Sequence, residues 1–562
     1  MSFWQSLTRK PSATPRSQFK PDWFVSFDAT EEAPEFSQAE PVYSASRQFA
    51  LVGDVWLANA ETLRAQLQAH VSSDLEIIAH LWEQQGAACL SHLQGMFAFA
   101  VWDVMQRRLW LVRDPVGART LYFAQQDQRT LIAPRSQKLA DRLRPAIDLV
   151  ALRDYLSCAF VPGERTMWQG ISEIRPGTML QLPERKATTY WQVEERITDA
   201  ERPIEWHAKR LRAELDQVIS EYLPANEAVG CYLSGGLDSS LVAALAKRLH
   251  TQPVHTYSIH FGSATPNELE FSSLVAEHCQ TKHQIIEITP QQMWEQLAEA
   301  LSLLDDPIGD PLTVPNLVLG RVAKQDVSVI LNGEGGDPCF GGPKNQPMLL
   351  SNLYQTADPA LAPDCVSAYL DSYQKCAADL PRLLKPDVWQ AVNDLPSVFA
   401  PELMSEGNYL NQLMFINTKF KGADHILTKV SNLTRAVGLS GRSPLFDRRI
   451  VDLSLTIPPE YKLSGAIEKA VLKAAVADVL PSAILERPKS GMMVPVQYWF
   501  RELWSRQAKA LLLHRHARIR EFLAPEIIKD WLAYRGDTWS RYGVKLWLLV
   551  SLELWLQTHQ IP

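Results

Sequence analysis

The segment that most constrains the fold of this chain is the run Ser-Gly-Gly-Leu-Asp-Ser-Ser at residues 234–240. It lies between an apolar, strand-like run at 228–233 and a helical pattern at 241–249. A strand, a glycine turn and a helix in this order bring free backbone N–H groups to one point, which favours binding of an anion such as phosphate. The run therefore predicts an α/β unit with an anion site at the start of its helix.

The residue types in this loop suit a phosphate group. Gly235 and Gly236 allow the backbone to come close to it, because glycine has no Cβ. Three hydroxyl groups are expected to donate hydrogen bonds to it: Ser234, Ser239 and Ser240. The alternative is a glycine turn with a serine N-cap and no ligand.

Asp238 would repel a phosphate unless it holds a divalent cation that bridges to the phosphate oxygens. The nucleotide-binding pattern G-x-x-x-x-G-K-[ST] is absent from the chain, so its lysine clamp on the terminal phosphates is not used. We therefore expect pyrophosphate to be the leaving group, rather than transfer of a phosphoryl group.

At 562 residues the chain is long enough for at least two domains. A net charge of −7 gives no electrostatic reason to expect nucleic acid or an anionic membrane as partner. No apolar run reaches the roughly 18 to 20 residues needed to cross a bilayer, and the start lacks the apolar core of a secretory signal. The most apolar stretch, 544–556, is predicted to be a packed amphipathic helix, and the protein is predicted to be cytoplasmic.

Seven cysteines are few for this length, and none is arranged as C-x-x-C. Neither a disulfide framework nor a thiolate zinc site is indicated, and each cysteine is predicted to be a small buried hydrophobe. The missing C-x-x-C also argues against sulfur-transfer enzymes that activate tRNA bases through a similar loop.

The loop at 234–240 resembles the pyrophosphatase loop of the asparagine synthetase family, of the asparagine synthetase B type, which also includes β-lactam synthetases and lasso-peptide cyclases. Further segments resemble the family's motifs in the family's order: LDDPIGDP at 304–311, LNGEGGDPCFGG at 331–342, RSPLFD at 442–447, EKAVLK at 468–473 and RPKSG at 487–491. With the amino-terminal matches, the resemblance covers most of the chain and weakens between about 343 and 420.

The amino-terminal half alternates short apolar runs with turn residues, which is typical of antiparallel strands. Strands are predicted at 49–56, 96–102, 109–112, 120–124 and 178–182, and helices at 60–71, 74–85 and 149–158. The segments at 95–103 and 113–122 resemble the family's G-M-F-A-F-A-x-W-D and R-D-x-x-G-x-K-P-L-Y. This resemblance implies the αββα sandwich of the amino-terminal-nucleophile glutaminases.

The residues that such a glutaminase needs are altered here. Position 2 is Ser2, an extension of about twenty residues precedes the recognisable fold, and the first cysteine is Cys89. A nucleophile that uses its own α-amine as base cannot lie deep in a helix. In the segment that resembles the glutamine-holding N-G-E-I-Y-N, Val52 replaces the first asparagine, and Asp74 alone still matches the pocket. We predict an inactive glutaminase domain kept as a scaffold, with fold-holding or interface roles for Arg113, Asp114 and Gly117.

The predicted domains are a glutaminase-like domain at 20–183, a polar linker at 184–206 and an ATP-pyrophosphatase, asparagine-synthetase-like domain at 207–562. The last combines an open parallel sheet, like that of adenine-nucleotide α-hydrolases, with a helical carboxyl-terminal part. Its strands are predicted at 229–233, 254–259, 284–288 and 327–331, and its helices at 241–249, 272–279 and 314–324. Loops after three of these strands are expected to meet in one crevice.

The resemblance implies ATP and Mg²⁺ as cofactors and assigns roles to the crevice. Asp238 and Asp337 would bind the magnesium ion. The pyrophosphate would be bound by Ser234, Gly235, Gly236, Ser239 and Ser240, and the adenosine by the backbone near Leu233, Ser258 and Gly333. Glu334 matches the general base and Lys469 the lysine that stabilises pyrophosphate and the tetrahedral intermediate, with Lys489 as a secondary candidate.

Each of these residues also has a structural alternative. Glu334 and Asp337 could only cap a helix start, and Lys469 could be a solvated helix lysine. Asp306 and Asp310 could fix a turn with the prolines that follow them. His283 is predicted to be structural, since no second histidine or cysteine lies at metal-ligand spacing.

Two departures from the family pattern lie where the acceptor should bind. Pro338 replaces a common glutamate, and the segment at 431–442 has lost its acidic residues. Both weaken the inference that the acceptor is aspartate. Glu334 separates the chain from β-lactam synthetases, which commonly carry tyrosine there.

The sequence therefore predicts an ATP- and magnesium-dependent amide ligase. It would adenylate a small-molecule or peptide carboxylate, release pyrophosphate and transfer the acyl group to ammonia or an amine. Two alternatives remain: an intramolecular macrolactam synthetase and a non-catalytic scaffold derived from the family. No nucleic acid or membrane partner is expected, and a homodimer remains a candidate assembly.

Overall fold

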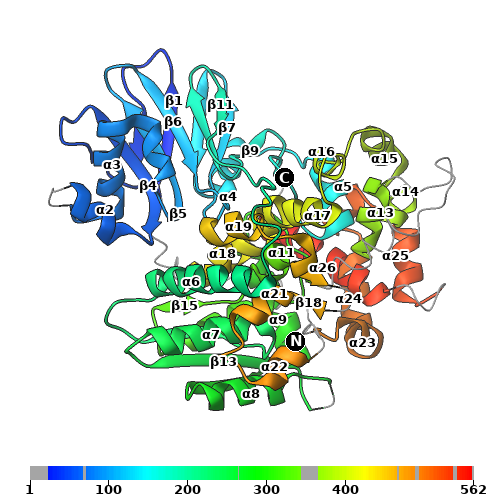
Figure 1. Cartoon of the computed structure of the whole chain (residues 1–562). Helices are drawn as coiled ribbons and strands as arrows, with labels where there is room; N and C mark the ends of the chain where they lie inside the picture. The colour runs from blue at the N-terminus through cyan, green and yellow to red at the C-terminus, as the bar shows by residue number, and fades with distance from the viewer. Residues whose placement is uncertain are drawn as a thin grey trace.

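The computed structural model describes residues 23–67, 71–263, 265–342, 365–464, 467–487, 493–535 and 541–559. In Figure 1 the amino-terminal strands form a β-sandwich above a carboxyl-terminal part that is built on a parallel sheet and many helices. We refer to the first, residues 23–189, as the amino-terminal sandwich.

The amino-terminal sandwich consists of two antiparallel sheets. The first has the order β2-β1-β8-β7-β9, with β1 Phe24–Asp28, β2 Glu35–Ser37, β7 Tyr122–Gln126, β8 Arg129–Ala133 and β9 Ile171–Glu173. The second has the order β11-β10-β6-β5-β4-β3, with β3 Val42–Tyr43, β4 Phe49–Leu57, β5 Gly95–Asp103, β6 Arg108–Arg113, β10 Thr178–Leu182 and β11 Lys186–Thr189. Side chains alternate along these strands, so one face of each sheet packs into the core between them.

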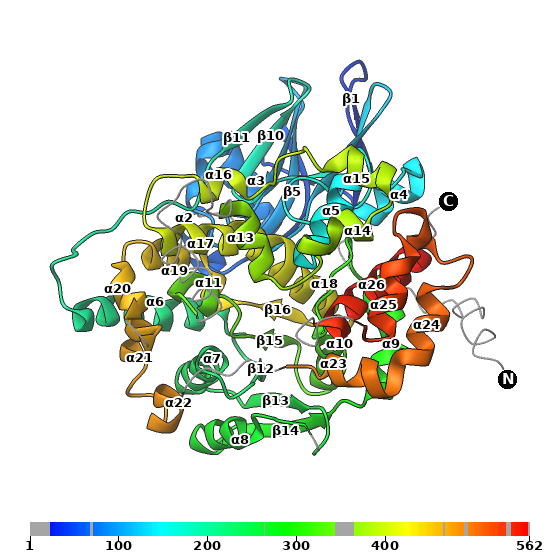
Figure 2. The same ribbon diagram turned by 90° about the vertical axis from the view of Figure 1, so that its right-hand side faces the viewer.

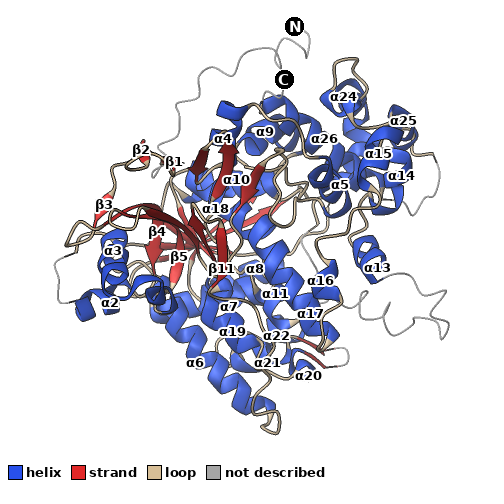
Figure 3. Cartoon of the chain, turned by 90° about the horizontal axis from the view of Figure 1, so that it is seen from above, coloured by secondary structure: helices blue, strands red, loops and turns tan. Residues whose placement is uncertain are grey.

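Helices cover both outer faces of the sandwich. α2 Ala60–Leu67 and α3 Asp74–Gln85 pack on the second sheet, and α4 Ser136–Leu143 and α5 Leu149–Cys158 on the first. Figure 3 shows α2 and α3 on the outer side of the strands. The αββα sandwich is therefore confirmed. The predicted linker at 184–206 is only partly irregular, because β11 pairs with β10 and α6 Ile204–Tyr222 begins within it.

The carboxyl-terminal part contains a five-stranded sheet in which every pairing is parallel. Its order is β14-β13-β12-β15-β16, with β12 Val229–Tyr232, β13 Val254–His260, β14 Lys282–Glu287, β15 Val329–Leu331 and β16 Ser440–Arg442. Figure 2 shows these strands one above another, from β16 to β14. The four predicted strands are confirmed, and β16 joins them at the edge.

Helices pack on both faces of this sheet, as in other open α/β folds. α6, α7 Leu237–Leu249 and α8 Leu269–His278 pack on one face, and α9 Pro290–Ser302 and α10 Thr313–Ala323 on the other. Ligands in such folds bind at the carboxyl ends of the strands. The carboxyl ends of β12, β13 and β15 are therefore the place to look for a site.

The remaining chain is mainly helical. Its middle segment contains α11 Gly336–Phe340, α13 Cys365–Ser372, η3 Ala377–Asp379, α14 Leu380–Leu383, α15 Pro386–Val392, α16 Ala400–Leu403, α17 Tyr409–Ile416, the π-helix η4 Asn417–Leu427 and α18 Thr428–Ala436. After β16 come η5 Pro444–Phe446, α19 Arg448–Ser454, α20 Pro459–Lys462, the hairpin β17 Leu463–Ser464 and β18 Ile467–Glu468, and α21 Ala470–Ala475. The last elements are α22 Ser482–Glu486, α23 Val496–Trp499, η6 Phe500–Trp504, α24 Ser505–Leu512, η7 Arg518–Glu521, α25 Pro525–Leu532 and α26 Tyr542–Thr558.

The packed helix predicted at 544–556 is confirmed as α26, but the prediction that it is amphipathic is wrong. Its side chains are buried almost all round, including Glu553, whose carboxylate accepts backbone N–H groups from Arg518 and Ile519 at 3.0 and 2.8 Å. A helix that is apolar all round belongs in the centre of a core. Among the described residues, no helix is long and apolar enough to span a membrane.

Candidate active site

A cavity of about 310 Å³ lies at the carboxyl ends of β12, β13 and β15. The three loops that were predicted to converge all contribute to it. Most of the predicted site residues line it: Leu233, Ser234, Gly236, Asp238, Ser239, Ser258, Gly333, Glu334, Asp337 and Lys469. The structure thus brings into one cavity residues that are up to 236 positions apart in the sequence (233 to 469).

The turn at the start of α7 is held by hydrogen bonds between its own serines. Ser239 Oγ accepts from the backbone N–H of Ser234 at 3.1 Å and lies 3.0 Å from Ser234 Oγ. Gly235 has a φ of 81°, which favours glycine, and a Cβ there would lie 2.6 Å from the backbone nitrogen of Ser272. The turn is therefore both left-handed and tightly packed against α8.

α7 begins at Leu237, about one turn earlier than predicted, with Gly236 as its N-cap. Ser240 therefore lies within the helix and faces the core, where it is fully buried and does not line the cavity. Gly235 is also absent from the lining. Of the residues predicted to contact phosphate, Ser234, Gly236 and Ser239 line the cavity.

Asp238, Asp337 and Lys469 form one ionic cluster at the floor of the cavity. Lys469 Nζ lies 2.5 Å from Asp238 Oδ2 and 2.6 Å from Asp337 Oδ1. The Lys469 side chain is 2% exposed, against 18% for Asp238 and 29% for Asp337. Burial alone would lower the pKa of Lys469, but the two carboxylates outweigh burial and raise it above its ordinary value. The alternative of a solvated helix lysine is excluded.

Glycines allow the loops that carry these carboxylates to interlock. A Cβ on Gly336 would lie 2.2 Å from Asp238 Cγ, and a Cβ on Gly333 would lie 2.5 Å from the backbone nitrogen of Ser239. The contact at Gly333 is with the backbone, so glycine is required there for the two loops to meet. The contact at Gly336 is with the carboxylate of Asp238, so a side chain there would displace that carboxylate from its place in the cluster.

The donor set of this cluster fits a magnesium ion. Mg²⁺ is commonly held by one or two protein carboxylates together with substrate phosphates and water. Asp238 and Asp337 supply two carboxylates at one point of the cavity. In the part of the chain that the structure describes, no group of three or more His, Cys, Asp or Glu side chains forms a metal site. A magnesium ion bound here would therefore depend on the phosphates for further ligands.

Glu334 lies at the cavity wall, half-buried, next to the carboxylate cluster in sequence. Its backbone N–H donates to Asn332 Oδ1 at 3.0 Å, and the Asn332 side chain donates to the carbonyl of Arg442 at 3.2 Å. These bonds fix the loop, and the helix that follows, α11, begins two residues after Glu334. Glu334 is therefore a residue of the cavity wall and not the N-cap of α11, which is Gly335.

Arg487 is a cavity residue to which the sequence gave no role. Its Nη1 donates to the carbonyl of Gly235 at 2.9 Å, and it pairs with Glu268. It lies in the RPKSG segment, where the sequence favoured Lys489, which lies outside the described residues. A guanidinium so close to the glycine turn adds a cation to the predicted pyrophosphate site.

The opposite wall of the cavity is formed by α10 and α18 and carries no charged side chain. Its lining residues are Leu312, Asn316, Leu319, Val430, Leu433 and Thr434. Leu433 and Thr434 of this wall belong to the segment 431–442, which lacks the acidic residues of the family pattern. The wall is therefore suited to apolar and neutral polar groups.

Cys89, the first cysteine of the chain, lies in the amino-terminal sandwich. Cys89 is fully buried, and burial raises the pKa of its thiol to about 12, so it is not a thiolate at neutral pH. Ser2 lies outside the described residues. Val52 is a core residue, and Asp74 accepts the N–H of Leu57 at 2.8 Å and pairs with Arg64. Asp74 is therefore engaged in holding the fold.

Arg113 and Asp114 hold the fold, as predicted. Arg113 is fully buried and donates to the carbonyls of Arg119, Ile174 and Gly117. Asp114 accepts four backbone N–H groups, those of Phe97, Val116, Ala118 and Arg119. These bonds fix the turn after β6.

Asp306, Asp310 and His283 also make structural contacts. Asp306 accepts the N–H of Met167 at 2.6 Å, and Asp310 accepts that of Leu312 at 3.0 Å. His283 Nδ1 lies 2.8 Å from Thr256 Oγ1. The two aspartates thus fix their turn, and Asp306 joins it to the amino-terminal sandwich.

The six fully buried cysteines agree with the prediction of small buried hydrophobes, and Cys365 is only half-buried. All seven are free thiols. The prediction that no disulfide framework exists is confirmed for these residues.

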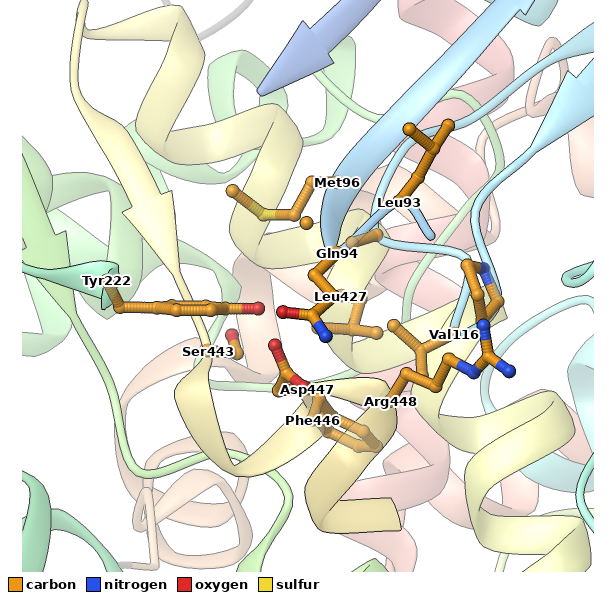
Figure 4. Close-up of a pocket in the computed structure, with 13 residues that line it drawn as sticks. Leu93, Gln94, Met96, Val116, Tyr222, Leu427, Ser443, Phe446, Asp447 and Arg448 are labelled. Atoms are coloured by element: carbon orange, nitrogen blue, oxygen red, sulfur yellow. The ribbon is translucent and has the colours of Figure 1, made fainter. Parts of the chain in front are cut away.

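A second, much smaller cavity lies where the two halves meet. Figure 4 shows Gln94 and Met96 on one side and Phe446, Asp447 and Arg448 on the other. Its volume is about 20 Å³, enough for about one water molecule. The interface between the halves is therefore closely packed at this point.

Lys462 lies next to the site, where its carbonyl accepts the N–H of Lys469 at 2.6 Å. The effect of burial on its protonation can be tested through the pH dependence of stability. Lys462 is fully buried, and burial lowers its pKa to about 7. The unfolded chain then binds more protons than the folded chain above pH 7, so the free energy of unfolding rises with pH. Between pH 7 and 8.5 we expect a gain of about 1–2 kcal/mol that Lys462→Met abolishes, measured by urea denaturation.

The control for this experiment is Lys247→Met, which changes a half-buried lysine of α7. It should keep the gain between pH 7 and 8.5. If Lys462→Met showed the same rise in the free energy of unfolding, Lys462 of the wild-type protein would be shown to stay protonated between pH 7 and 8.5.

Comparisons with known proteins agree with this arrangement. The family of asparagine synthase matches residues 210–557, and the glutamine amidotransferase domain matches residues 34–191. Glutamine-hydrolyzing asparagine synthetase 1 of Bacillus subtilis is 24% identical over 531 residues, covering 88% of this chain and 83% of that protein. A putative glutamine-hydrolyzing asparagine synthetase of Mycobacterium bovis is 26% identical over 560 residues, covering 90% and 84%.

Glutamine-hydrolyzing asparagine synthetase B of Escherichia coli is 23% identical over 480 residues, covering 82% of this chain and 72% of that protein. The match to the first family spans more than half of the chain and includes every described residue of the ionic cluster. By this match, and by the order of its motifs, the chain belongs to the asparagine synthase family.

Proposed function

We propose that the protein is an ATP-dependent carbon–nitrogen ligase that adenylates a carboxylate, releases pyrophosphate and transfers the acyl group to ammonia or an amine. The observation that carries this proposal is the cluster of Asp238, Asp337 and Lys469 beside the glycine turn of α7. It combines two potential magnesium ligands and a buried cation at a helix N-terminus. Such an arrangement suits the charge that develops when pyrophosphate leaves the α-phosphate of ATP.

Each cavity residue then has a role that its position supports. Asp238 and Asp337 would hold Mg²⁺, which would supply positive charge to neutralise the phosphates of ATP. The hydroxyls of Ser234 and Ser239 and the backbone N–H of Gly236 would donate to the pyrophosphate. Lys469 would stabilise the leaving pyrophosphate and the tetrahedral intermediate.

The remaining roles concern the nucleoside and the incoming nitrogen. The backbone near Leu233, Ser258 and Gly333 would bind the adenosine. Glu334 would accept the proton of the attacking amine, as a half-buried carboxylate at the cavity wall can do. The neutral wall of α10 and α18 would then contact the acceptor.

The proposed substrates are a small-molecule or peptide carboxylate and ammonia or an amine, so asparagine formation and a related amidation both remain within the proposal. An intramolecular macrolactam closure would use the same chemistry with both groups on one molecule. The proposed domain boundaries are 20–183, 184–206 and 207–562. We place the reaction in the cytoplasm.

The experiment that tests the proposal measures magnesium-dependent release of pyrophosphate from ATP. The panel of carboxylates should include aspartate and a leader-processed peptide, each with and without ammonium chloride. We expect AMP and pyrophosphate in equal amounts with at least one carboxylate, and none with EDTA. Formation of ADP would instead contradict adenylation of the carboxylate. No release of pyrophosphate with any carboxylate would favour the non-catalytic scaffold.

The nitrogen source provides a separate prediction. Because Cys89 is buried and Val52 replaces the glutamine-holding asparagine, we expect glutamine not to replace ammonia as donor. The measurement compares amide formation with ammonium chloride and with glutamine, and follows glutamate release from glutamine. Glutamate production by the purified protein above the buffer rate would contradict the prediction of an inactive glutaminase.

A further inference from the structure

Asp54 lies in β4, in the segment whose family counterpart holds glutamine, and its carboxylate is already engaged by two arginines. Its Oδ2 lies 3.0 Å from Arg119 Nε and also forms an ion pair with Arg435 Nη1. The three side chains are 11%, 8% and 19% exposed, respectively. Arg119 belongs to the amino-terminal sandwich, whereas Arg435 belongs to α18 of the carboxyl-terminal part. Asp54 therefore joins the two halves of the chain through a nearly buried ionic contact.

The contact with α18 has a second point of attachment. Arg119 Nη1 donates to Ser431 Oγ at 3.3 Å. Ser431 and Arg435 are four positions apart and therefore lie on the same face of the helix. The amino-terminal sandwich thus holds one face of α18 at two successive turns.

Other residues of the same helix form the wall of the nucleotide cavity. Val430, Leu433 and Thr434 line the cavity. Val430 is adjacent in sequence to Ser431, Thr434 is adjacent to Arg435, and Leu433 lies between the two attached residues. Side chains in a helix are linked rigidly to its backbone, and packed interiors transmit small displacements. A shift of the face that Asp54 holds would therefore move the cavity wall.

The contact is sensitive to loss of the carboxylate. Without it, both guanidinium groups would lose a carboxylate that lies against them in a nearly buried place, and removing one partner of a buried ion pair is destabilising. The attachment of Arg435, and with it of this face of α18, to the amino-terminal sandwich would then be weaker. The carboxylate at position 54 therefore links α18 to the sandwich.

We propose that Asp54 is a positioning residue through which the amino-terminal sandwich fixes α18, and that this contact keeps the acceptor wall of the cavity in place. The former glutamine-holding segment would thus have become the link between the two halves. The expected change in KM rests on the proposed function, whereas the expected change in hydrogen exchange of α18 does not. The retained sandwich then contributes to the ligase reaction without supplying nitrogen.

The test compares Asp54→Asn and Arg435→Gln with the wild-type protein by hydrogen exchange and by steady-state kinetics. In both variants we expect the backbone amides of α18 to exchange about tenfold faster, because local opening is easier. We also expect KM for the carboxylate to rise about tenfold while KM for ATP changes less than about twofold, because only the acceptor wall is displaced. Asp54→Glu should restore most of both properties.

The matched control is Asp452→Asn, which removes a contact between the linker and the carboxyl-terminal part, the hydrogen bond of 3.0 Å from Trp191 Nε1 to Asp452 Oδ1. Asp452 lies in α19, which does not line the nucleotide cavity. This variant should leave the exchange of α18 and KM for the carboxylate unchanged.

Unchanged exchange of α18 in Asp54→Asn and Arg435→Gln would overturn the inference, and so would equal effects of Asp452→Asn. If the wild-type protein released no pyrophosphate, the proposed function would fail. The exchange data would still decide whether Asp54 holds α18.

Discussion

Asp238→Asn is expected to lower the formation of AMP and pyrophosphate by about 100- to 1,000-fold, in line with the loss of one group that stabilises charge in a transition state. The asparagine keeps the shape of the side chain but removes the charge that a magnesium ion needs. It also leaves Lys469 with one carboxylate partner in place of two. The measurement is the rate of pyrophosphate release at saturating ATP and magnesium, with the best carboxylate of the panel.

Asp478→Asn is the matched control for this variant, because Asp478 is an exposed carboxylate that pairs with Arg212 and Arg248, and none of the three lines the cavity. It should retain wild-type activity. Full activity of Asp238→Asn would remove the proposed metal role of Asp238.

Lys469→Met is expected to lower the same rate by about 100-fold or more, because the variant removes the cation that would stabilise the leaving pyrophosphate. The loss should appear mainly in kcat, since the transition state carries more charge than bound ATP. Two carboxylates would then face each other without the ammonium group, so magnesium should restore part of the stability that is lost. Activity and thermal midpoints with and without magnesium measure these effects.

Lys247→Met serves as control, since Lys247 lies in the last turn of α7, at the opposite end of the helix from the glycine turn. A loss in kcat of less than threefold for Lys469→Met would assign that residue a structural role only. An equal loss for Lys247→Met would point to a general effect on α7.

The sequence predicted those elements in which apolar residues recur at the spacing of a strand or a helix. β12, β13 and α3 are examples, and each lies within two residues of its predicted range. β16 was missed because Ser440–Arg442 contains no apolar residue, and its pairing with β15 depends on backbone hydrogen bonds alone. β11 was missed for a similar reason, because all four of its residues are exposed.

The candidate site was predicted from motifs, but its internal contacts were not. The ion pair of Lys469 with Asp238 joins residues 231 positions apart, and that of Arg435 with Asp54 joins residues 381 positions apart. No local pattern encodes such pairs, because they depend on how the elements pack. The start of α7 could not be predicted closely either. The helix begins one turn earlier than predicted, and Ser240 therefore faces the core instead of the cavity.

The fully enclosed helix α26 has a consequence for biosynthesis. It spans Tyr542–Thr558 and packs against α9, and its Leu548 carbonyl accepts a hydrogen bond from Tyr155 of α5. Neither α5 nor α9 can therefore complete its packing until the ribosome has synthesised α26. A stop codon placed before Tyr542 should leave nascent chains that are open to proteases.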